Sequence, residues 1–305
     1  MSKTLTMLVG PPGSGKSTFS KQLVQTAFRK KAPVYVNQDS QGVDHFAVFD
    51  DALLAGDDIV VDRMNFNKEQ RGRYLRLAKD FGYRTKIVVL HQPYDVCFER
   101  IMNRKNHETI KDEKAARGAL HTFFTRYERV SDDEADEIER VWPKGDKRYA
   151  IICDLDGTLC NIEHRLVYVK NSPKDWKAFF QNLDKDTPNQ WCVDLLKGLS
   201  KQYAIVYCSG RPRDHKEQTV EWLKKYGLDK LNWAGLIGHN DRYDFYLYMR
   251  AGGDFRRDDI VKEIILDFEI LTRFTPYLMI DDRQQVVDMW RKRGYTCLQC
   301  APGDF

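Results

Sequence analysis

The stretch Tyr149-Ala-Ile-Ile-Cys-Asp-Leu-Asp-Gly-Thr-Leu159 lies at the middle of this 305-residue chain, and the segments on its two sides carry different motifs. Its apolar residues end at a turn signal at Gly157, a pattern that predicts a short buried strand. Because side chains two residues apart on a strand point to the same side, we expect Asp154 and Asp156 to come together. Adjacent carboxylates repel unless a cation lies between them or one holds a proton, so this strand end predicts a catalytic site.

The six residues Asp154-Leu-Asp-Gly-Thr-Leu159 are more specific than the pair of acids alone. They resemble the first motif of the haloacid-dehalogenase-type phosphatases. A carboxylate can attack a phosphoryl group and form an aspartyl-phosphate. The resemblance implies that Asp154 is this nucleophile and that Asp156 is the general acid and base. For the pair of acids alone, a solvated strand end remains the alternative.

Composition and cysteine content are those of a soluble globular protein. Apolar residues make up 42% and charged residues 31%, and no apolar run is long enough to cross a bilayer. Because the chain enters its first predicted strand directly after Met1-Ser2-Lys3, we expect a cytoplasmic protein without a membrane partner. The seven cysteines are scattered through apolar segments, which favours buried free thiols. For Cys297-Leu-Gln-Cys300, a core strand is favoured over a metal or redox site.

The net charge of +4 comes from the first half of the chain. Residues 1–150 contain 26 Lys and Arg against 22 Asp and Glu, whereas residues 151–305 contain 23 of each. This bias suits a polyanionic ligand, and a solvated mixed surface is the alternative explanation.

A second motif lies near the N-terminus. Residues 5–9 predict a strand that runs into Gly10-Pro-Pro-Gly-Ser-Gly-Lys-Ser-Thr18 and then into a helical pattern, which is the context of a P-loop. Backbone N–H groups of such a loop surround phosphate oxygens at the positive end of the helix. We expect Lys16 at the β and γ phosphates of ATP and the Ser17 hydroxyl on Mg²⁺. The full predicted ATP site is Gly10, Gly13, Ser14, Gly15, Lys16, Ser17 and Thr18.

Strand and helix patterns alternate on both sides of the central stretch, which predicts an α/β fold with two mostly parallel, helix-covered sheets. We expect a P-loop domain at residues 1–130 and a second domain at residues 148–305. Between them, residues 131–147 are acidic and only weakly periodic, which predicts a linker. Residues 161–188 do not fit the alternation. They predict either a small cap over the second site or a surface helix with an aromatic face docked on the core.

Several polar residues follow predicted strands, where ligands bind in open α/β sheets. Asp39 is expected either as the base for an attacking hydroxyl or as the N-cap of a helix. Asp62 is expected to support Mg²⁺ through water. In the second half, Ser209-Gly-Arg211 suits phosphate oxygens, and Asp281-Asp-Arg283 adds acids for an all-oxygen Mg²⁺ site.

Together these motifs resemble the polynucleotide kinase 3′-phosphatase family, in particular its phage and bacterial members. The likeness covers nearly the whole chain and is closest after Ala150, where it includes Arg257-Asp-Asp-Ile-Val-Lys262 and Ile280-Asp-Asp-Arg-Gln-Gln-Val-Val-Asp-Met-Trp290. It implies a P-loop kinase fold followed by a haloacid-dehalogenase-like Rossmannoid fold. It also implies an end-healing enzyme that transfers the ATP γ-phosphate to 5′-hydroxyl ends of DNA or RNA and removes 3′-phosphates through an aspartyl-phosphate.

The resemblance assigns roles to single residues. Asp39 would be the base that activates the 5′-hydroxyl, and Arg104 the arginine of a lid over the γ-phosphate. The Mg²⁺ ligands of the second domain would be Asp154, Asp156, Asp281 and Asp282. The implied contacts to the substrate or its phosphate are Arg165, Ser209, Gly210, Arg211, Asp258 and Lys262.

Two positions depart from the phage-type pattern. The phage-type enzyme has an arginine for the acceptor's phosphate three residues after its catalytic Asp, and that position is Gly42 in this chain. The lid arginine is set only by spacing, which leaves Arg100 and Lys105 as alternatives to Arg104.

Two other classes of protein remain open. A small-metabolite kinase fused to a small-molecule phosphatase would share both phosphate sites and need no basic track, whereas a nucleotide-gated scaffold would bind ATP without turnover. We find no Lys-x-Asp-Gly nucleotidyltransferase signature, so sealing of the ends would require a separate ligase. The sequence leaves the oligomeric state open, a homo-oligomer included.

Overall fold

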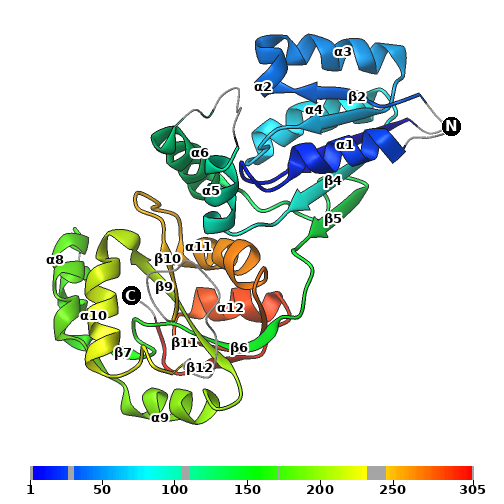
Figure 1. The fold of residues 1–305 in the computed structure, drawn as a ribbon. Coiled ribbons are helices and arrows are strands. Elements are labelled where there is room, and N and C mark those ends of the chain that lie inside the picture. Colours follow the sequence, from blue (N-terminus) through cyan, green and yellow to red (C-terminus); the bar gives the residue numbers. More distant parts are fainter. Residues whose placement is uncertain are drawn as a thin grey trace. The chain divides into compact units, whose positions relative to one another are not determined.

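A computed structural model describes residues 3–26, 31–104, 110, 112–170, 172–231 and 245–303 of the chain. The chain divides into two compact units, Met1–Lys144 and Gly145–Phe305 (Figure 1). A five-stranded sheet forms the centre of each unit, and every strand pair within these two sheets is parallel. Helices cover both sheets, so the predicted α/β class is confirmed.

The sheet of the first unit has the strand order β2-β3-β1-β4-β5. Its strands are β1 Thr4–Val9, β2 Val34–Asn37, β3 Ile59–Asp62, β4 Arg84–Leu90 and β5 Glu137–Val141. Its helices are α1 Lys16–Thr26, α2 Gln38–Gln41, α3 His45–Ala55, α4 Lys68–Asp80, α5 Tyr94–Met102 and α6 Glu113–Arg126, with a 3-10 turn at Gly42–Asp44. Because β1 lies between β3 and β4, its carboxyl end is a topological switch point, where open α/β sheets bind ligands.

The segment that we expected to be a linker, residues 131–147, contains β5. This strand pairs with β4 at the edge of the first sheet, and Lys86 of β4 forms ion pairs with Glu137 and Glu139 across it. The acidic residues therefore belong to folded structure, and the division between the units follows Lys144.

The sheet of the second unit has the order β10-β9-β6-β11-β12, with the quoted central stretch forming its middle strand. Its strands are β6 Arg148–Cys153, β9 Ala204–Pro212, β10 Tyr246–Arg250, β11 Phe274–Asp281 and β12 Cys297–Gln299. Its main helices are α9 Gln190–Leu199, α10 Lys216–Lys225, α11 Asp258–Ile265, continued by a π-helical turn Leu266–Ile270, and α12 Gln284–Lys292, with a 3-10 turn at Arg213–His215.

Alternating side chains of β6 enter two different hydrophobic clusters. Ile151 and Cys153 pack with residues of α9 and α10, whereas Ala150 and Ile152 pack with residues of α11 and α12. This is the two-residue period of a strand that is buried on both faces. The helices α9 and α10 therefore cover one face of the sheet and α11 and α12 the other (Figure 1).

Residues 160–188 form a small insertion between β6 and α9 (Figure 1). It consists of the two-stranded antiparallel sheet β7 Cys160–Asn161 and β8 Thr187–Pro188, the helices α7 Glu163–Lys170 and α8 Trp176–Gln181, and a 3-10 turn at Leu183–Lys185. Phe179 is buried in the main core, while Trp176 and Phe180 line a cavity above Asp154. Both expectations for this segment thus hold in part, because its aromatic face docks on the core and also borders the site.

The cysteines are free, as the cysteine pattern predicted, and the described helices are not membrane-spanning. All seven cysteines are free thiols, and Cys297 of the CxxC sequence lies in β12. Among the described helices, none has both the length and the apolar character that crossing a bilayer requires.

Two candidate phosphate sites

The loop after β1 has the geometry of a phosphate cradle. Gly13 and Gly15 have φ values of +82° and +99°, which side chains other than glycine rarely adopt. A Cβ atom on Gly13 would also lie 2.5 Å from the Cys97 carbonyl oxygen. The buried Ser14 Oγ has no hydrogen-bond partner within the described residues. An orphaned hydroxyl beside two such glycines fits the oxygens of a bound phosphate chain.

Lys16 opens α1 and is buried at the floor of this loop. Its Nζ donates hydrogen bonds of 2.9 Å to the carbonyl oxygens of Gly10 and Pro11. Burial lowers the pKa of Lys16, and the nearby Asp62 opposes this change. Ser17 and Thr18 are exposed in the first turn of α1, where Ser17 lines the same cavity as Lys16.

Asp62 ends β3 and is buried beside the P-loop. Its Oδ2 accepts a 2.6 Å hydrogen bond from the Tyr35 hydroxyl, which itself accepts one of 2.9 Å from Asn37 Nδ2. Burial and Asp62 raise the pKa of Tyr35 to about 12, so this hydroxyl stays protonated and keeps its donor role. The carboxylate of Asp62 is thereby held beside Lys16.

Asp39 lies at the exposed carboxyl end of β2, in the first turn of α2. The N-cap of this helix is Asn37, whose Oδ1 accepts hydrogen bonds from the backbone N–H groups of Asp39 and Ser40. The alternative that Asp39 is the cap is therefore wrong. Its side chain lines a cavity of about 320 Å³ together with Lys16, Ser17 and Asp62.

Arg104 lines this cavity too, and it also borders the neighbouring pocket beside Gly13 and Gly15. Arg100 borders only that second pocket, where its Nη1 donates a 3.4 Å hydrogen bond to the Gly13 carbonyl. The third candidate, Lys105, lies outside the described residues.

At the position where the phage-type enzyme has an arginine for the acceptor's phosphate, Gly42 has no side chain to contact it. Besides Arg104, Arg63 lines the cavity with Asp39. Its guanidinium is held by Gln38 and Tyr74.

In the second unit, three buried carboxylates meet at the carboxyl ends of β6 and β11. One oxygen each of Asp154, Asp281 and Asp282 lies within 4.8 Å of the others. Lys262 of α11 reaches into this acidic group, with its Nζ 2.6 Å from Asp154 Oδ1 and 2.9 Å from Asp281 Oδ2. This buried all-oxygen donor set fits a hard divalent cation such as Mg²⁺.

Electrostatics within the acidic group follow from its burial. Burial raises the pKa of Asp154 well above its ordinary value, with Asp281 and Asp282 adding to the effect and Lys262 opposing it. The pKa of Asp282 is raised to about 6, again by burial first and then by Asp281. Added positive charge at this position would favour the ionised carboxylates.

The side chain of Asp156 does not join the acidic group of Asp154, Asp281 and Asp282 but lies in a second group with Cys160 and Asp186. Its assignment as a metal ligand stays a prediction. Its Oδ1 accepts hydrogen bonds from Arg165 Nη2 at 2.5 Å and from Arg211 Nε at 2.9 Å. Burial alone would raise the pKa of Asp156, but Arg211 and Arg165 outweigh it and hold this pKa well below the usual range. The strand β6 ends at Cys153, so the two-residue period on which we relied does not extend to these two acids.

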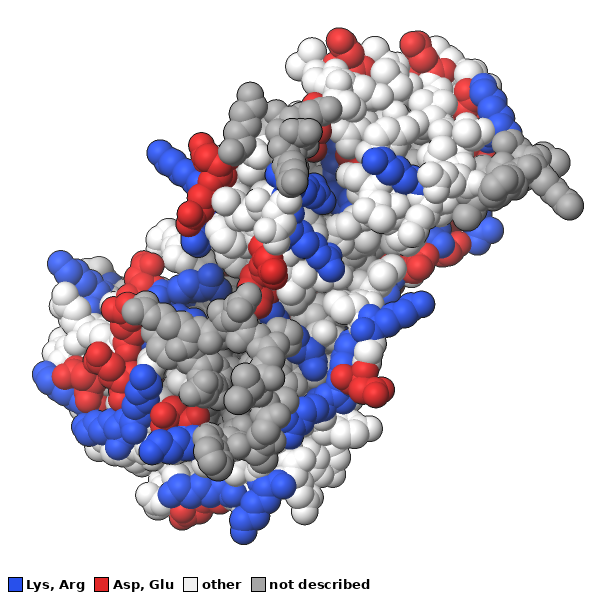
Figure 2. Space-filling model, in the orientation of Figure 1, with Lys and Arg blue, Asp and Glu red and all other residues white. Residues whose placement is uncertain are grey.

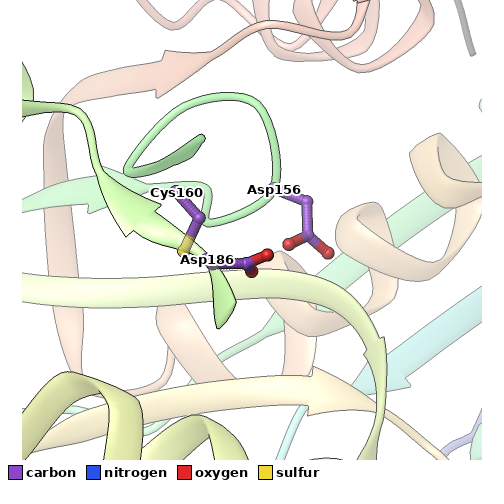
Figure 3. A group of neighbouring side chains, drawn as sticks. All are labelled: Asp156, Cys160 and Asp186. Atoms are coloured by element: carbon purple, nitrogen blue, oxygen red, sulfur yellow. The ribbon is translucent and has the colours of Figure 1, made fainter. Parts of the chain in front are cut away.

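Asp186 completes this second cluster, although no motif or spacing in the sequence points to it. Its fully buried carboxylate accepts from Arg165 Nε at 2.7 Å and from Arg211 Nη2 at 2.8 Å. Figure 3 shows the carboxylate of Asp186 pointing toward that of Asp156, with the Cys160 thiol beside it. Two guanidinium groups thus lie between two carboxylates, next to the site of the expected nucleophile.

The other residues predicted to contact the substrate or its phosphate lie near Asp154 and Asp156. Ser209 is buried at the end of β9, where its Oγ accepts from the Arg211 backbone N–H at 3.2 Å. A Cβ atom on Gly210 would overlap Asp258 Oδ1, so a side chain there would displace Asp258. Asp258 Oδ1 also accepts from Arg250, a residue that sequence reasoning missed, at 3.1 Å. A cavity of about 500 Å³ opens above these residues, lined by Asp154, Asp156, Gly210, Asp258, Lys262 and Asp282.

Residues of both charge signs occur on the face of the molecule drawn in Figure 2. On the face drawn in Figure 2, Lys and Arg are interspersed with Asp and Glu. Two of the basic residues of the first half, Arg63 and Arg104, line the P-loop cavity.

Family models match both units. The model of the polynucleotide kinase PNKP phosphatase domain matches residues 148–305, which is more than half of the chain, and an AAA domain model matches residues 5–130. Among solved structures, a chain in the Pnkp1/Rnl/Hen1 complex is 24% identical, with a TM-score of 0.39, and the match covers 100% of this chain and 98% of that one. A chain in the Pnkp1/Rnl/Hen1 RNA repair complex is 23% identical, with a TM-score of 0.41 and coverage of 100% and 97%.

Two curated proteins are similar over different lengths. A protein of Autographa californica nuclear polyhedrosis virus, assigned as a bifunctional polynucleotide kinase/RNA ligase, is 24% identical over 95% of this chain. Transcription factor bHLH140 of Arabidopsis thaliana is 33% identical over 33% of this chain. The chain spans 41% of the length of the viral relative and 12% of that of the plant relative.

Proposed function

Because this chain belongs to the family of the polynucleotide kinase PNKP phosphatase domain, we propose that it heals nucleic-acid ends. The first unit transfers the γ-phosphate of ATP to 5′-hydroxyl ends, and the second unit removes 3′-phosphates. One observation carries the proposal: each unit has a cavity lined by charged side chains at the carboxyl end of its central strand, and the two cavities contain different chemical groups. The first has a P-loop lysine, and the second has a buried aspartate suited to nucleophilic attack.

In the phosphatase site, the reaction begins with Asp154. Its carboxylate oxygen attacks phosphorus, a bond forms between them, and the bond from phosphorus to O3′ breaks. The leaving O3′ takes a proton from Asp156. A water molecule then attacks the aspartyl-phosphate, giving its proton to Asp156, and inorganic phosphate and free Asp154 result.

Arg165 and Arg211 hold the carboxylate of Asp156 at the edge of the cavity. Without substrate they hold its pKa low, which suits a base but not an acid. Both guanidinium groups are fully buried and neither lines the cavity, whereas Asp156 does. The negative charge of a phosphate bound in the cavity would therefore act on Asp156 and raise its pKa toward the value that a general acid needs.

A divalent cation such as Mg²⁺ would be held by Asp154, Asp281 and Asp282, where it would offset the charge of the carboxylates and the phosphate. Lys262 contributes a fixed positive charge at Asp154 and Asp281. This charge favours the ionised nucleophile against the effect of burial.

In the kinase site, Asp39 takes the proton of the 5′-hydroxyl. The bond from O5′ to the γ-phosphorus forms as the bond from that phosphorus to the β–γ bridging oxygen breaks, and ADP leaves. Lys16 and the P-loop N–H groups contact the β and γ phosphates, Ser17 contributes to a cation site, and Arg104 approaches the transferred group. Joining of the healed ends is a further step that neither of these two sites performs.

The test uses the full chain and a single-stranded oligonucleotide with a 5′-hydroxyl and a 3′-phosphate, in DNA and RNA forms. With ATP and Mg²⁺ we expect label from [γ-³²P]ATP at the 5′ end and release of inorganic phosphate from the 3′ end. Nucleosides and sugar phosphates serve as competing substrates. Turnover of those small molecules without change at either oligonucleotide end would contradict the proposal.

A further inference from the structure

The cavity above Asp154 has an aromatic wall that the phosphatase chemistry does not use. Trp176, Phe179 and Phe180 of α8 contact one another, with ring centroids 5.2 to 6.0 Å apart. Phe179 is buried under the guanidinium of Arg165, at 4.2 Å, and so belongs to the core. Trp176 is 42% exposed and lines the cavity with Phe180. The wall therefore offers flat apolar surface next to the residues that hold the phosphate.

The same cavity is bordered by Phe255, in the loop between β10 and α11. Its side chain is 96% exposed, yet the backbone around it is firmly held. Arg250 Nη1 donates to the carbonyl oxygens of Asp254 at 3.0 Å and of Arg256 at 2.6 Å. Arg256 Nη2 in turn donates to Asp254 Oδ2 at 2.6 Å. A large aromatic ring is thus carried at the edge of the cavity on a backbone that is held in place.

Positive charge accompanies both aromatic residues. Lys174 Nζ lies 5.4 Å from the centre of the Trp176 ring. Arg257, two residues after Phe255, lines the cavity with a side chain that is 65% exposed and forms an ion pair with Asp259 at 3.1 Å. At the floor of the cavity, Lys262 and the cation that the acidic group would hold supply positive charge for a phosphate. A fitting ligand therefore carries a phosphate for the floor, flat groups for the walls and further negative charge for the rim.

We propose that Trp176 and Phe255 stack on the bases at a single-stranded 3′ end, while Lys174 and Arg257 contact its internucleotide phosphates. This inference rests on the proposed 3′-phosphatase function and specifies how the site selects a polynucleotide. Stacking on aromatic side chains is tolerant of sequence, because every base has a flat face. A sugar phosphate offers nothing to either ring, so the site distinguishes a polynucleotide end from a small phosphate ester.

The test compares two oligonucleotides that differ in one group. Both end in a 3′-phosphate, but one carries a tetrahydrofuran residue in place of the terminal nucleoside and therefore lacks its base. The readout is the ratio of kcat/KM with the base to kcat/KM without it. For the unmodified protein we expect a ratio of about ten or more, as base stacking predicts.

Substitutions then assign the effect to a side chain. Phe255→Ala or Trp176→Ala should bring the ratio toward one, because a missing ring cannot sense a missing base. Phe255→Trp should retain the ratio. The control Leu298→Ala removes an exposed apolar side chain of the same unit that does not line the cavity, and should keep the ratio of the unmodified protein. Matching thermal unfolding curves establish that each variant is folded.

The outcomes separate this inference from the function on which it rests. Release of phosphate from both oligonucleotides at equal efficiency would overturn the stacking and leave the phosphatase function standing. A ratio that stays at about ten in both alanine variants would overturn it too. If neither oligonucleotide released phosphate, the proposed function itself would fail, and the inference with it.

Discussion

Gly157 adjoins the acidic group of the second unit with no space for a side chain. Its φ is +87°, and a Cβ atom would overlap Asp282 Oδ2. We predict that Gly157→Ala displaces Asp282 and lowers 3′-phosphatase activity by about 10²-fold, as a misplacement of about 1 Å can do. The 5′-kinase activity, which depends on the other unit, should be unchanged. Phosphate release and 5′ labelling of the same oligonucleotide measure the two.

A matched control lies in the same unit. Gly198 is in α9, and a Cβ atom there meets nothing within 4 Å. Gly198→Ala should leave both activities intact and stabilise the helix by up to about 1 kcal/mol, because alanine is the better helix former. Full phosphatase activity in Gly157→Ala would show that Asp282 can move without consequence, and would remove this carboxylate from the proposed cation site.

At this scale, the sequence identified the reacting groups better than it identified their partners. Asp154, Asp281 and Asp282 were expected at strand ends, and they do meet. The partners of Asp156 depend on a loop beyond Cys153, for which no spacing rule applies. Asp186 lies in the irregular insertion, so only burial and two facing arginines reveal it.

Among the elements of the first unit, α4 is joined to the segment before β5 by a buried ion pair. Arg71 is fully buried, and its Nε and Nη2 donate to Glu134 at 2.6 and 2.9 Å. Its Nη1 donates to the carbonyl oxygens of Asn65 and Glu128. Arg71→Ala leaves these acceptors without their donor, so we predict a loss of about 3 to 5 kcal/mol in the stability of the first unit.

Hydrogen exchange measured by mass spectrometry reports the stability of each unit separately. Amides of β4 and β5 should lose protection in Arg71→Ala, while those of β6 and β11 keep theirs. The control is Arg76→Ala, which removes an exposed arginine from the same helix and should change protection little. Equal protection in the Arg71 and Arg76 variants would mean that the buried pair does not stabilise this unit.

In the two large sheets, the strands that the sequence patterns missed are β5 and β10, and both are edge strands. Every residue of β5 is only half-buried, and its glutamates pair with a neighbouring strand instead of solvent. An edge strand needs less apolar sequence than a central one, because it pairs on one side only. The strong periodic signals of β1 and β6 come from their central positions.

For the molecule as a whole, the sequence predicted two α/β units, each with a motif after a central strand. The fold follows because a parallel sheet must be buried on both faces by helices. The position of the motifs follows because the loops at the carboxyl ends of the strands all lie at one edge of the sheet. The sequence could not place the boundary at Lys144, because acidic residues that pair across a sheet look the same as solvated ones. Of the three residues proposed for the lid, Arg100 and Arg104 lie among the described residues, and both border one pocket beside the P-loop.

The central claim is that two independent phosphate chemistries share this chain, and separation of function tests it most directly. The measurement follows both ends of one oligonucleotide, with a 5′-hydroxyl and a 3′-phosphate, in two variants. We predict that Asp39→Ala abolishes 5′ phosphorylation and keeps 3′-phosphate release, and that Asp154→Asn does the reverse. Loss of both activities in either variant, with its fold intact, would contradict the two-site account.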